Sequence, residues 1–211
     1  MNATLLIVAK APIPGLAKTR IAATVGPDAA ADLAAAALLD TLDVAKRCDA
    51  EVVVALTGDL GSAARADALR EALADVSVIP QRGRDLAERL AHAHADAAGH
   101  GPVVQIGMDT PQVSVDDLAA ADALVRSDGS VLGPALDGGW WLLGLDDASR
   151  AEFLAGIPMS ASDTGERTQA ALGAGGPRLR ELRDMDTWAD AVAIAAEVPD
   201  RRIAASARRW S

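Results

Sequence analysis

The sequence is poor in the residues that disulfide-stabilised, membrane-spanning and aromatic-cored proteins rely on. Its 211 residues include one cysteine, Cys48, and no tyrosine, and only 2% are aromatic. One cysteine cannot form an internal disulfide, which fits a reducing, cytoplasmic location, and we expect Cys48 to be a small buried hydrophobe. No stretch approaches the roughly 20 apolar residues that cross a bilayer, so we expect no membrane span. The first ten residues lack the basic region and the cleavage site of a signal peptide, and they have the pattern of a strand.

Positive charge is also scarce. The chain has 30 acidic residues against 20 lysines and arginines, and its formal net charge is −10. Such a surface repels nucleic acid, so we expect no nucleic-acid partner. It would repel a free nucleotide as well, and a nucleotide site therefore requires a local cluster of basic residues.

Aliphatic residues are abundant, and half of the chain is hydrophobic. This is the composition of a folded globular protein. The pattern predicts strands at 4–9, 51–56, 76–80 and 103–107, and helices at 27–46, 62–74, 84–98 and after Ser114, which forms a capping box with Asp117. The alternation predicts an α/β fold, with a mainly parallel sheet and helices on both faces.

The second half of the chain adds an antiparallel element. Two apolar runs, 130–136 and 140–145, are separated by a DGG turn, which is typical of a hairpin. Beyond it the pattern predicts helices near 147–155 and 163–173, an edge strand at 178–182, a helix capped by Thr187 and Asp190, and a basic tail of helical character. The length favours a single domain over residues 1–211.

Basic residues gather directly after the first strand. The segment 9–20, AKAPIPGLAKTR, contains Lys10, Lys18 and Arg20, separated by a turn with Pro14 and Gly15. Such a loop can wrap phosphates with backbone N–H groups and basic side chains. It matches neither a Walker A loop nor G-x-G-x-x-G, and the alternative is a solvated loop with ordinary surface lysines.

Carboxylates occur at two places where a metal could bind. Asp109 follows a buried strand, where a carboxylate is costly unless it is paired or bound to a metal. Mg²⁺ takes one or two protein carboxylates together with phosphate oxygens, so we expect Asp109 to hold it; the alternative, a helix cap, is already filled by Ser114. Asp184 and Asp186 point the same way in an extended segment, and either could be the second ligand. The alternative for this pair is a favourable position at a helix N-terminus.

The hairpin turn LDGGWW allows two interpretations. Asp-Gly between strands is a strong hairpin signal by itself. In the functional interpretation, Asp137 and the flexible Gly138 and Gly139 lie beside the acceptor or sugar, and Trp140 or Trp141 stacks on a ring. Strand alternation buries at least one of these tryptophans in either case.

The histidines do not have the spacing of a metal site. His92 and His94 lie on different faces of the predicted helix, and neither a cysteine nor a glutamate joins them in zinc spacing. We expect these residues and His100 to lie at the surface or at its boundary.

Three segments, in this order and spacing, resemble a known family. "KAPIPGLAKTR", "GMDTP" and "GPALDGGWWLLGL" are similar to segments of a bacterial family of GT-A-like glycosyltransferases of the arsenosugar-biosynthesis type. That family is similar in turn to the molybdenum-cofactor and phospholactate guanylyltransferases. The resemblance covers nearly the whole chain, and it implies a Rossmann-like GT-A fold that binds a nucleotide at its N-terminal half.

The resemblance also implies roles for individual residues. It assigns phosphate contacts to Lys10, Lys18 and Arg20, metal binding to Asp109 and Asp186, and the acceptor-side loop to Asp137, Gly138 and Gly139. From the residues themselves we also expect Asp109 and Asp137 to be catalytic, Pro14 and Gly15 to bind phosphate, and Trp140 to bind the acceptor. Two positions depart from the family pattern: Met108 replaces a small residue, and "MSA" at 159–161 replaces Trp-Ser-Thr. The second departure leaves Asp163 as a weaker acceptor-side candidate.

Three functions follow, in order of preference. The first is a metal-dependent transferase that uses a nucleotide-sugar donor, a small-molecule acceptor and Mg²⁺ or Mn²⁺. The second is a nucleotidyltransferase that moves a nucleoside monophosphate from a nucleoside triphosphate to a phosphorylated small molecule, which the basic loop favours. The third is a non-catalytic nucleotide-binding module.

Overall fold

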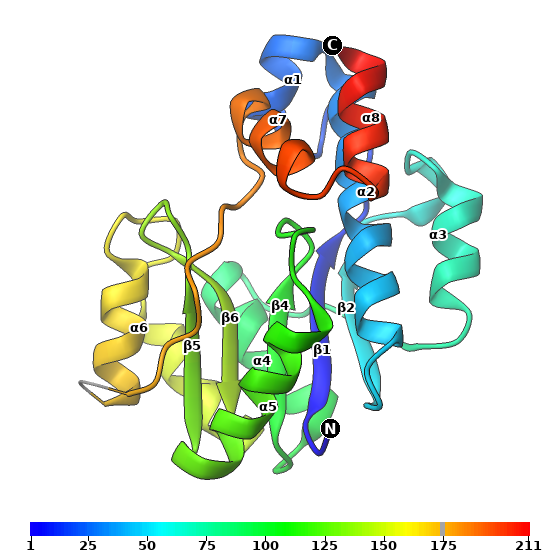
Figure 1. Ribbon diagram of the computed structural model, residues 1–211. Helices are drawn as coiled ribbons and strands as arrows, with labels where there is room; N and C mark the ends of the chain where they lie inside the picture. Colours follow the sequence, from blue (N-terminus) through cyan, green and yellow to red (C-terminus); the bar gives the residue numbers. More distant parts are fainter. Residues whose placement is uncertain (174–175) are drawn as a thin grey trace.

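The computed structural model describes residues 1–173 and 176–211, which surround a six-stranded sheet (Figure 1). The strands are β1 (Thr4–Lys10), β2 (Val52–Thr57), β3 (Ser77–Pro80), β4 (Val103–Gly107), β5 (Ser130–Pro134) and β6 (Trp140–Leu145). They lie in the order β3-β2-β1-β4-β6-β5. The first four strands are parallel, whereas β6 pairs antiparallel with both β4 and β5. The predicted α/β fold with a late antiparallel hairpin is therefore confirmed.

The strand order reverses at β1. From β1 the chain proceeds outward to β2 and β3, and it then returns to place β4 on the other side of β1. In open α/β sheets, ligands bind at the carboxyl ends of the strands where the order reverses. The two strand ends that meet here are those followed by the basic loop and by Asp109.

One face of the sheet is covered by α2 (Pro27–Lys46), α3 (Ala66–Leu73) and α5 (Val115–Asp128). Gly26, with a φ of 89°, precedes α2, and Pro27 suits its first turn because proline needs no N–H partner there. Leu38 and Leu42 of α2 are fully buried against the strands. The predicted capping box of Ser114 starts α5.

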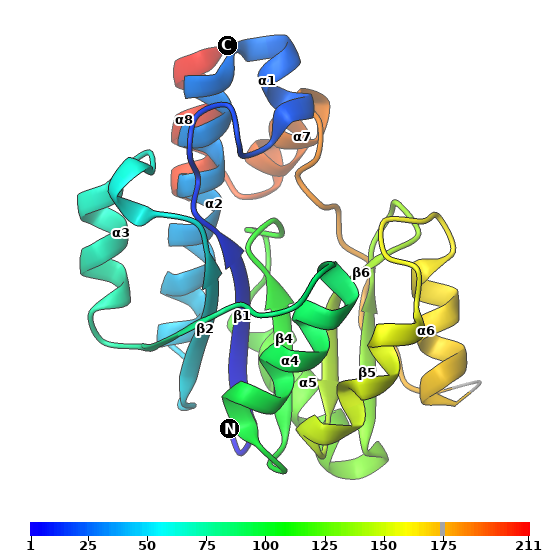
Figure 2. The same ribbon diagram turned by 180° about the vertical axis from the view of Figure 1, so that it is seen from behind.

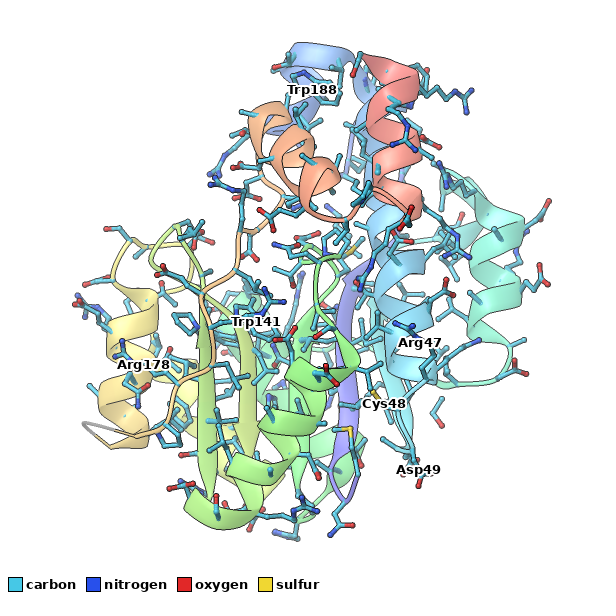
Figure 3. The ribbon with its side chains drawn as sticks, in the orientation of Figure 1. Arg47, Cys48, Asp49, Trp141, Arg178 and Trp188 are labelled. Carbon is cyan, nitrogen blue, oxygen red and sulfur yellow. The ribbon has the colours of Figure 1, made fainter. Side chains whose placement is uncertain are left out.

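The opposite face is covered by α4 (Leu86–Ala98) and the 3₁₀ segment η2 (Ala148–Gly156), with α6 (Thr164–Leu172) beside β5 (Figure 2). Leu90 and Ala93 of α4 lie on one apolar stripe of this helix, and both pack towards the strands. Trp140 and Trp141 point to opposite faces, and Trp141 is buried in the core, where its Nε1 donates to the carbonyl of Arg180 at 3.1 Å (Figure 3).

A helical cluster at the carboxyl-end side of the sheet brings together segments from the first and the last parts of the chain. It consists of α1 (Thr19–Val25), α7 (Trp188–Glu197) and α8 (Arg202–Trp210), packed around the first half of α2 (Figure 1). Ile21, Leu33, Ile194 and Ile203 form its core. The predicted capping box of Thr187 starts α7. Cys48 lies just after the other end of α2 and is buried, as expected (Figure 3).

Several details differ from the sequence prediction. Residues 178–182 form two isolated parallel bridges, Leu132 with Arg178 and Ala135 with Leu182, and the predicted edge strand is wrong, since this segment only touches β5. His94 is fully buried and not at the surface. Leu86 shares an apolar stripe of the sequence with Leu90, Ala93 and Ala97, yet it is 45% exposed.

Two helical features were not predicted. They are α1 and a short 3₁₀ turn, η1 (Leu60–Ser62), which delays the start of α3 to residue 66. Within the described residues, no helix combines the length and the apolar character that crossing a bilayer requires.

The buried His94 should make the fold sensitive to acid. Burial lowers the pKa of His94 to about 4, although its hydrogen bond with Gln105 acts in the opposite direction. In the unfolded chain the pKa is about 6.5, so the unfolded state takes up the proton first. This contribution to stability is complete above about pH 6.5 and falls as the pH drops towards 4, by about 3 kcal/mol in total.

Urea unfolding at about pH 7 and about pH 4.5 measures this loss. His94→Gln removes the titrating group and should flatten the pH dependence. His100→Gln, at an exposed position, should leave the wild-type dependence unchanged. The same steep dependence in His94→Gln would contradict the assignment.

Candidate functional site

The loop after β1 presents Lys18 in a strained conformation. Ala17 N donates to the carbonyl of Ile13 at 3.0 Å, which closes the turn that contains Pro14 and Gly15. Lys18 then adopts the left-handed conformation, with φ 47° and ψ 52°, and caps α1. A non-glycine residue in this region is uncommon, and such strain is concentrated at functional sites.

Asp109 lies beside this loop because β4 pairs directly with β1. Its Oδ2 is 2.8 Å from Lys18 Nζ, and the Lys18 side chain is only 11% exposed. Its Oδ1 is enclosed and has no hydrogen-bond partner among the described residues. Met108, one residue earlier, accepts a hydrogen bond from the backbone N–H of Lys10 to its sulfur at 3.2 Å. The strand ends are thus tied together on either side of Asp109.

A remote segment brings further carboxyl groups to the same place. Met185 N donates to the carbonyl of Asp109 at 3.0 Å, and Gln112 Nε2 donates to the carbonyl of Arg183 at 2.6 Å. These bonds hold Asp184 and Asp186 alongside the end of β4, on the connection that runs from α6 past β5 to α7 (Figure 1).

Asp186 completes a chain of alternating charges. Its Oδ1 lies 3.2 Å from Lys18 Nζ, and its Oδ2 lies 3.0 Å from Nη1 of Arg20. Lys18 therefore bridges two carboxylates, Asp109 and Asp186, that are 77 positions apart in sequence. Like charges this close would repel without a cation between them.

The titration of the cluster reflects this crowding. Burial acts to lower the pKa of Lys18, but the neighbouring Asp109 and Asp186 carboxylates outweigh it and hold the pKa above its ordinary value. Burial, together with the charges of Asp109 and Asp137, raises the pKa of Asp184 to about 8. Asp184 therefore carries a proton at neutral pH, whereas the lysine stays charged.

Two adjoining chambers meet at this cluster. The first has a volume of about 380 Å³ and is lined by Lys10, Leu16, Ala17, Lys18, Thr19, Arg20, Ala34, Met108, Asp109, Ser160 and Asp186. The second has a volume of about 290 Å³ and lies between β1, β4, β6, α4 and the start of α6. The chambers share Met108, Asp109, Ser160 and Asp186. Their volumes lie near the lower end of the range for small-molecule sites.

The hairpin turn forms one wall of the second chamber. Asp137 Oδ1 accepts from Gly139 N at 2.9 Å, and Gly165 N donates to the carbonyl of Gly138 at 2.8 Å. Gly138 has a φ of 88°, which favours glycine. This turn is thereby attached to the start of α6, and it places Asp137 and Trp140 on the chamber wall.

The predicted site residues fall into three groups. Lys10, Lys18, Arg20, Asp109 and Asp186 line the first chamber, and Asp137, Gly139 and Trp140 line the second. The predicted Pro14, Gly15 and Gly138 line neither chamber; the first two are exposed at the tip of the loop. Asp163 pairs with Arg167 at the start of α6.

Sequence reasoning assigned no role to several lining residues, among them Met159, Ser160 and Gln105. Ser160 lines both chambers and has a φ of 62°, and Met159 lines the second. The only sequence signal for these two is the departure "MSA" at 159–161 from the family pattern. Gln105 did have a signal, because it is the only polar side chain in the strand VVQIG.

The family comparison covers residues 39–161, more than half of the chain, and matches a family of uncharacterized proteins conserved in bacteria, DUF2064. The chain belongs to this family. The matched residues include β4, Asp109 and the hairpin turn, but they begin after the basic loop. No curated protein matches the chain.

Solved structures give a wider comparison for this DUF2064 member. A candidate nucleotide-diphospho-sugar transferase from Desulfovibrio desulfuricans is 26% identical, with a TM-score of 0.85 over 99% of this chain and 95% of its own. CMP:2-keto-3-deoxy-manno-octonic acid synthetase, in complex with CTP, is 14% identical, with a TM-score of 0.58 over 94% and 99%. Rv0371c from Mycobacterium tuberculosis, in complex with manganese, is 21% identical, with a TM-score of 0.55 over 92% and 98%.

These neighbours bear on the expected enzyme class. They include nucleotide-sugar transferases and nucleotidyltransferases, so the expectation of an enzyme of one of these two kinds is confirmed at the level of the fold. The likeness to a nucleotide-diphospho-sugar transferase extends over nearly the whole DUF2064 chain.

The donor set fits a divalent cation that is held only in part by protein. Asp109 Oδ1 is an enclosed oxygen that has no hydrogen-bond partner among the described residues, and Asp186 is paired with the same lysine, Lys18, as Asp109. Among residues 1–173 and 176–211, no group of three or more histidine, cysteine or acidic side chains could enclose a metal. Mg²⁺ commonly takes one or two carboxylates and completes its coordination with phosphate oxygens and water.

The hairpin turn should be sensitive to one added carbon. In Gly138→Ala, an ideal Cβ would lie 2.0 Å from the carbonyl oxygen of Ser162, at a φ of 88°. We expect the free energy of unfolding to fall by more than about 2 kcal/mol, because the backbone must move. Gly156→Ala is the matched control, since nothing lies within 4 Å of its added Cβ, and it should change stability by less than about 1 kcal/mol. Equal urea midpoints for the two variants would refute this packing.

Proposed function

We propose that the protein transfers a glycosyl group from a nucleotide-sugar donor to a small-molecule acceptor with the help of Mg²⁺ or Mn²⁺. The observation that carries this proposal is the position of Lys18 Nζ, 2.8 Å from Asp109 and 3.2 Å from Asp186, where the two chambers join. A basic group and two carboxylates at a strand end suit a diphosphate that arrives with a divalent cation.

The first chamber is the place for the diphosphate of the donor. Lys10, Lys18 and Arg20 offer positive charge on one wall, and Lys18 is already fixed by its backbone conformation and by its ion pairs. A fixed donor loses little freedom on binding, which increases the fraction of its interaction energy available for affinity. Arg20 is exposed, so it can follow the ligand.

Asp109 and Asp186 would hold the cation, and the cation would neutralise charge on the diphosphate as it leaves. When a phosphate and a metal enter, Lys18 can exchange its carboxylate partners for phosphate oxygens. Asp184 can lose its proton near a divalent cation, since positive charge favours the ionised carboxylate.

Asp137 would act on the acceptor. It lies on the wall of the second chamber and its Oδ1 is fixed by Gly139 N. In the transfer, an acceptor hydroxyl oxygen bonds to the anomeric carbon and the bond from that carbon to the diphosphate breaks. The hydroxyl proton passes to Asp137, and the nucleoside diphosphate departs.

A nucleotidyltransferase is the second candidate. The three basic residues of the first chamber suit a triphosphate, and the fold is shared with a synthetase that was solved with CTP. In that reaction a phosphorylated substrate attacks the α-phosphate and pyrophosphate leaves, so that catalysis rests on positioning and charge neutralisation. A non-catalytic nucleotide-binding module is the third candidate.

The similarity to a nucleotide-diphospho-sugar transferase, over 99% of the chain, supports the glycosyl reaction as the first choice. The manganese complex of Rv0371c supports a divalent cation. The narrower resemblance, to transferases of the arsenosugar-biosynthesis type, belongs to the proposal and rests on the sequence motifs alone.

Thermal unfolding with UDP-glucose, GDP-mannose, CTP, GTP and UTP, each with and without Mg²⁺, tests the function. A nucleotide sugar at about 100 times its Kd should add about 2.7 kcal/mol of stability. Asp109→Asn should lose the part of this gain that depends on Mg²⁺, while Asp128→Asn, which changes an exposed carboxylate at the last residue of α5, should keep it. A larger gain with a triphosphate would favour nucleotidyl transfer, and a gain that ignores Mg²⁺ would favour the binding module.

Lys18→Met should weaken ligands according to their phosphates. Methionine keeps the length of the side chain and removes its charge, so the affinity for a nucleoside diphosphate should fall about tenfold or more, while that for the nucleoside should not change. Lys46→Met, which removes a lysine paired only loosely with Asp75 at 3.7 Å, is the matched control. Calorimetric titration measures the affinities, and an equal loss for nucleoside and diphosphate would contradict a phosphate contact.

A further inference from the structure

The second chamber differs from the first in its charged residues. Among the described residues, four carboxyl groups line it and no lysine or arginine does; they belong to Asp109, Asp137, Asp184 and Asp186. The three basic residues of the basic loop line the first chamber only. Asp109 and Asp186 are paired with Lys18, and Asp184 carries a proton at neutral pH. Asp137 has no basic partner among the described residues, so it is the carboxylate that a phosphate in the second chamber would meet without a cation beside it.

The same chamber offers an apolar surface. Leu86, Leu90, Trp140 and Met159 contribute to its walls. Leu86 is the first residue of α4 and is 45% exposed, although its neighbours on the helix are packed against the sheet. A ligand that covers this leucine and the indole would remove apolar surface from water, which favours binding.

A buried amide provides an independent indication of a ligand. Gln105 lies on β4 at the floor of the chamber, and it is only 2% exposed. Its Oε1 is 2.9 Å from Nε2 of the buried His94, which fixes the amide. Its Nε2 has no hydrogen-bond partner in the described part of the chain, so this N–H₂ group is what Gln105 can offer to an occupant. Nearby, Trp140 Nε1 is enclosed and has no hydrogen-bond partner among the described residues.

Buried donors in native proteins nearly always find an acceptor. An occupant that reaches the amide of Gln105 should therefore present an oxygen acceptor, such as a hydroxyl, ether or carbonyl group. A carboxylate or phosphate would accept as well, but Asp137, which has no basic partner among the described residues, opposes its charge. The second chamber thus combines apolar walls with an amide donor and an unpaired carboxylate.

On the basis of the transfer reaction proposed above, we propose that the second chamber binds the acceptor, and that the acceptor is uncharged or cationic, with an apolar face and an oxygen that accepts from Gln105. It carries neither a phosphate nor a carboxylate. Charge then separates the two substrates, since the polyanionic donor is attracted to the first chamber and repelled from the second. They meet at the shared Asp109.

Methionine methyl groups make the two chambers separately observable. The four methionines are Met1, Met108, Met159 and Met185. Met159 borders the second chamber and Met108 borders both, while neither Met1 nor Met185 lines either one. The full chain labelled with ¹³C-methyl methionine is titrated with phenyl β-D-glucopyranoside and, separately, with its 6-phosphate, two probes that differ in one phosphate.

The neutral probe should shift the Met159 signal and leave Met1 in place. At the same concentration, the phosphorylated probe should shift Met159 at least tenfold less. The opposite order, or equal shifts with both probes, would overturn the proposal.

Two substitutions test which residues cause the preference for the neutral probe. Gln105→Met removes the amide donor at nearly constant volume, and it should weaken the neutral probe about fivefold, the effect of one lost hydrogen bond. Asp137→Asn, which keeps the oxygen that accepts from Gly139, should reduce the discrimination against the phosphorylated probe. Asp75→Asn removes the same charge from an exposed site after α3 and should leave the discrimination intact. Unaltered affinity in Gln105→Met, or unaltered discrimination in Asp137→Asn, would count against the assignment.

A third titration, with UDP-glucose or GDP-mannose in the presence of Mg²⁺, separates this inference from the function on which it rests. If UDP-glucose shifts Met108 but both glucosides bind alike, the transferase proposal stands and the acceptor class is wrong. If the neutral glucoside is selected at Met159 but neither UDP-glucose nor GDP-mannose affects Met108, the selectivity of the chamber is upheld and nucleotide-sugar transfer is wrong.

Discussion

The ion pairs of Lys18 with Asp109 and Asp186 are the interaction on which the rest of the site depends. They join the loop after β1, the end of β4 and the connection to α7, three segments far apart in the sequence. Without the lysine, two carboxylates would face each other across a partly enclosed space, in a chain whose net charge is already −10. The same lysine is the group that an incoming phosphate would meet, so one side chain stabilises the empty arrangement and prepares it for a polyanion.

The scaffold holds these charges in place with backbone contacts. Arg201, at the start of α8, donates to the carbonyls of Pro111 and Val113, and Met185 N donates to the carbonyl of Asp109. The helical cluster of α1, α7 and α8 therefore packs against α2 and also fixes the loop after Asp109. The C-terminal part of the chain therefore positions the loop that follows Asp109, although few of its side chains line a chamber.

The two chambers would suit the proposed transfer. In that reaction one substrate carries a diphosphate, and the other must approach the same carbon atom without competing for the same pocket. Here basic residues line one chamber, and carboxyl groups with apolar walls line the other. Electrostatic contrast of this kind contributes to specificity more than to raw affinity. Gly138, in the hairpin turn at 137–139, and Ser160 both adopt a positive φ. Ser160 lies where the two chambers adjoin, and the hairpin turn forms one wall of the second.

Local sequence determined the elements and the separate motifs. Apolar runs fixed β1 to β6, the Ser114 and Thr187 boxes fixed two helix starts, and the spacing of charges marked the basic loop and Asp109, because each signal acts over a few neighbouring residues. Tertiary structure alone decided that Lys18 lies between Asp109 and Asp186, that Gln105 and His94 share a buried hydrogen bond, and that residues 178–182 are not a full strand. These features depend on which strands become neighbours and on how a chain crosses over them, and no local pattern of residues encodes such long-range pairing.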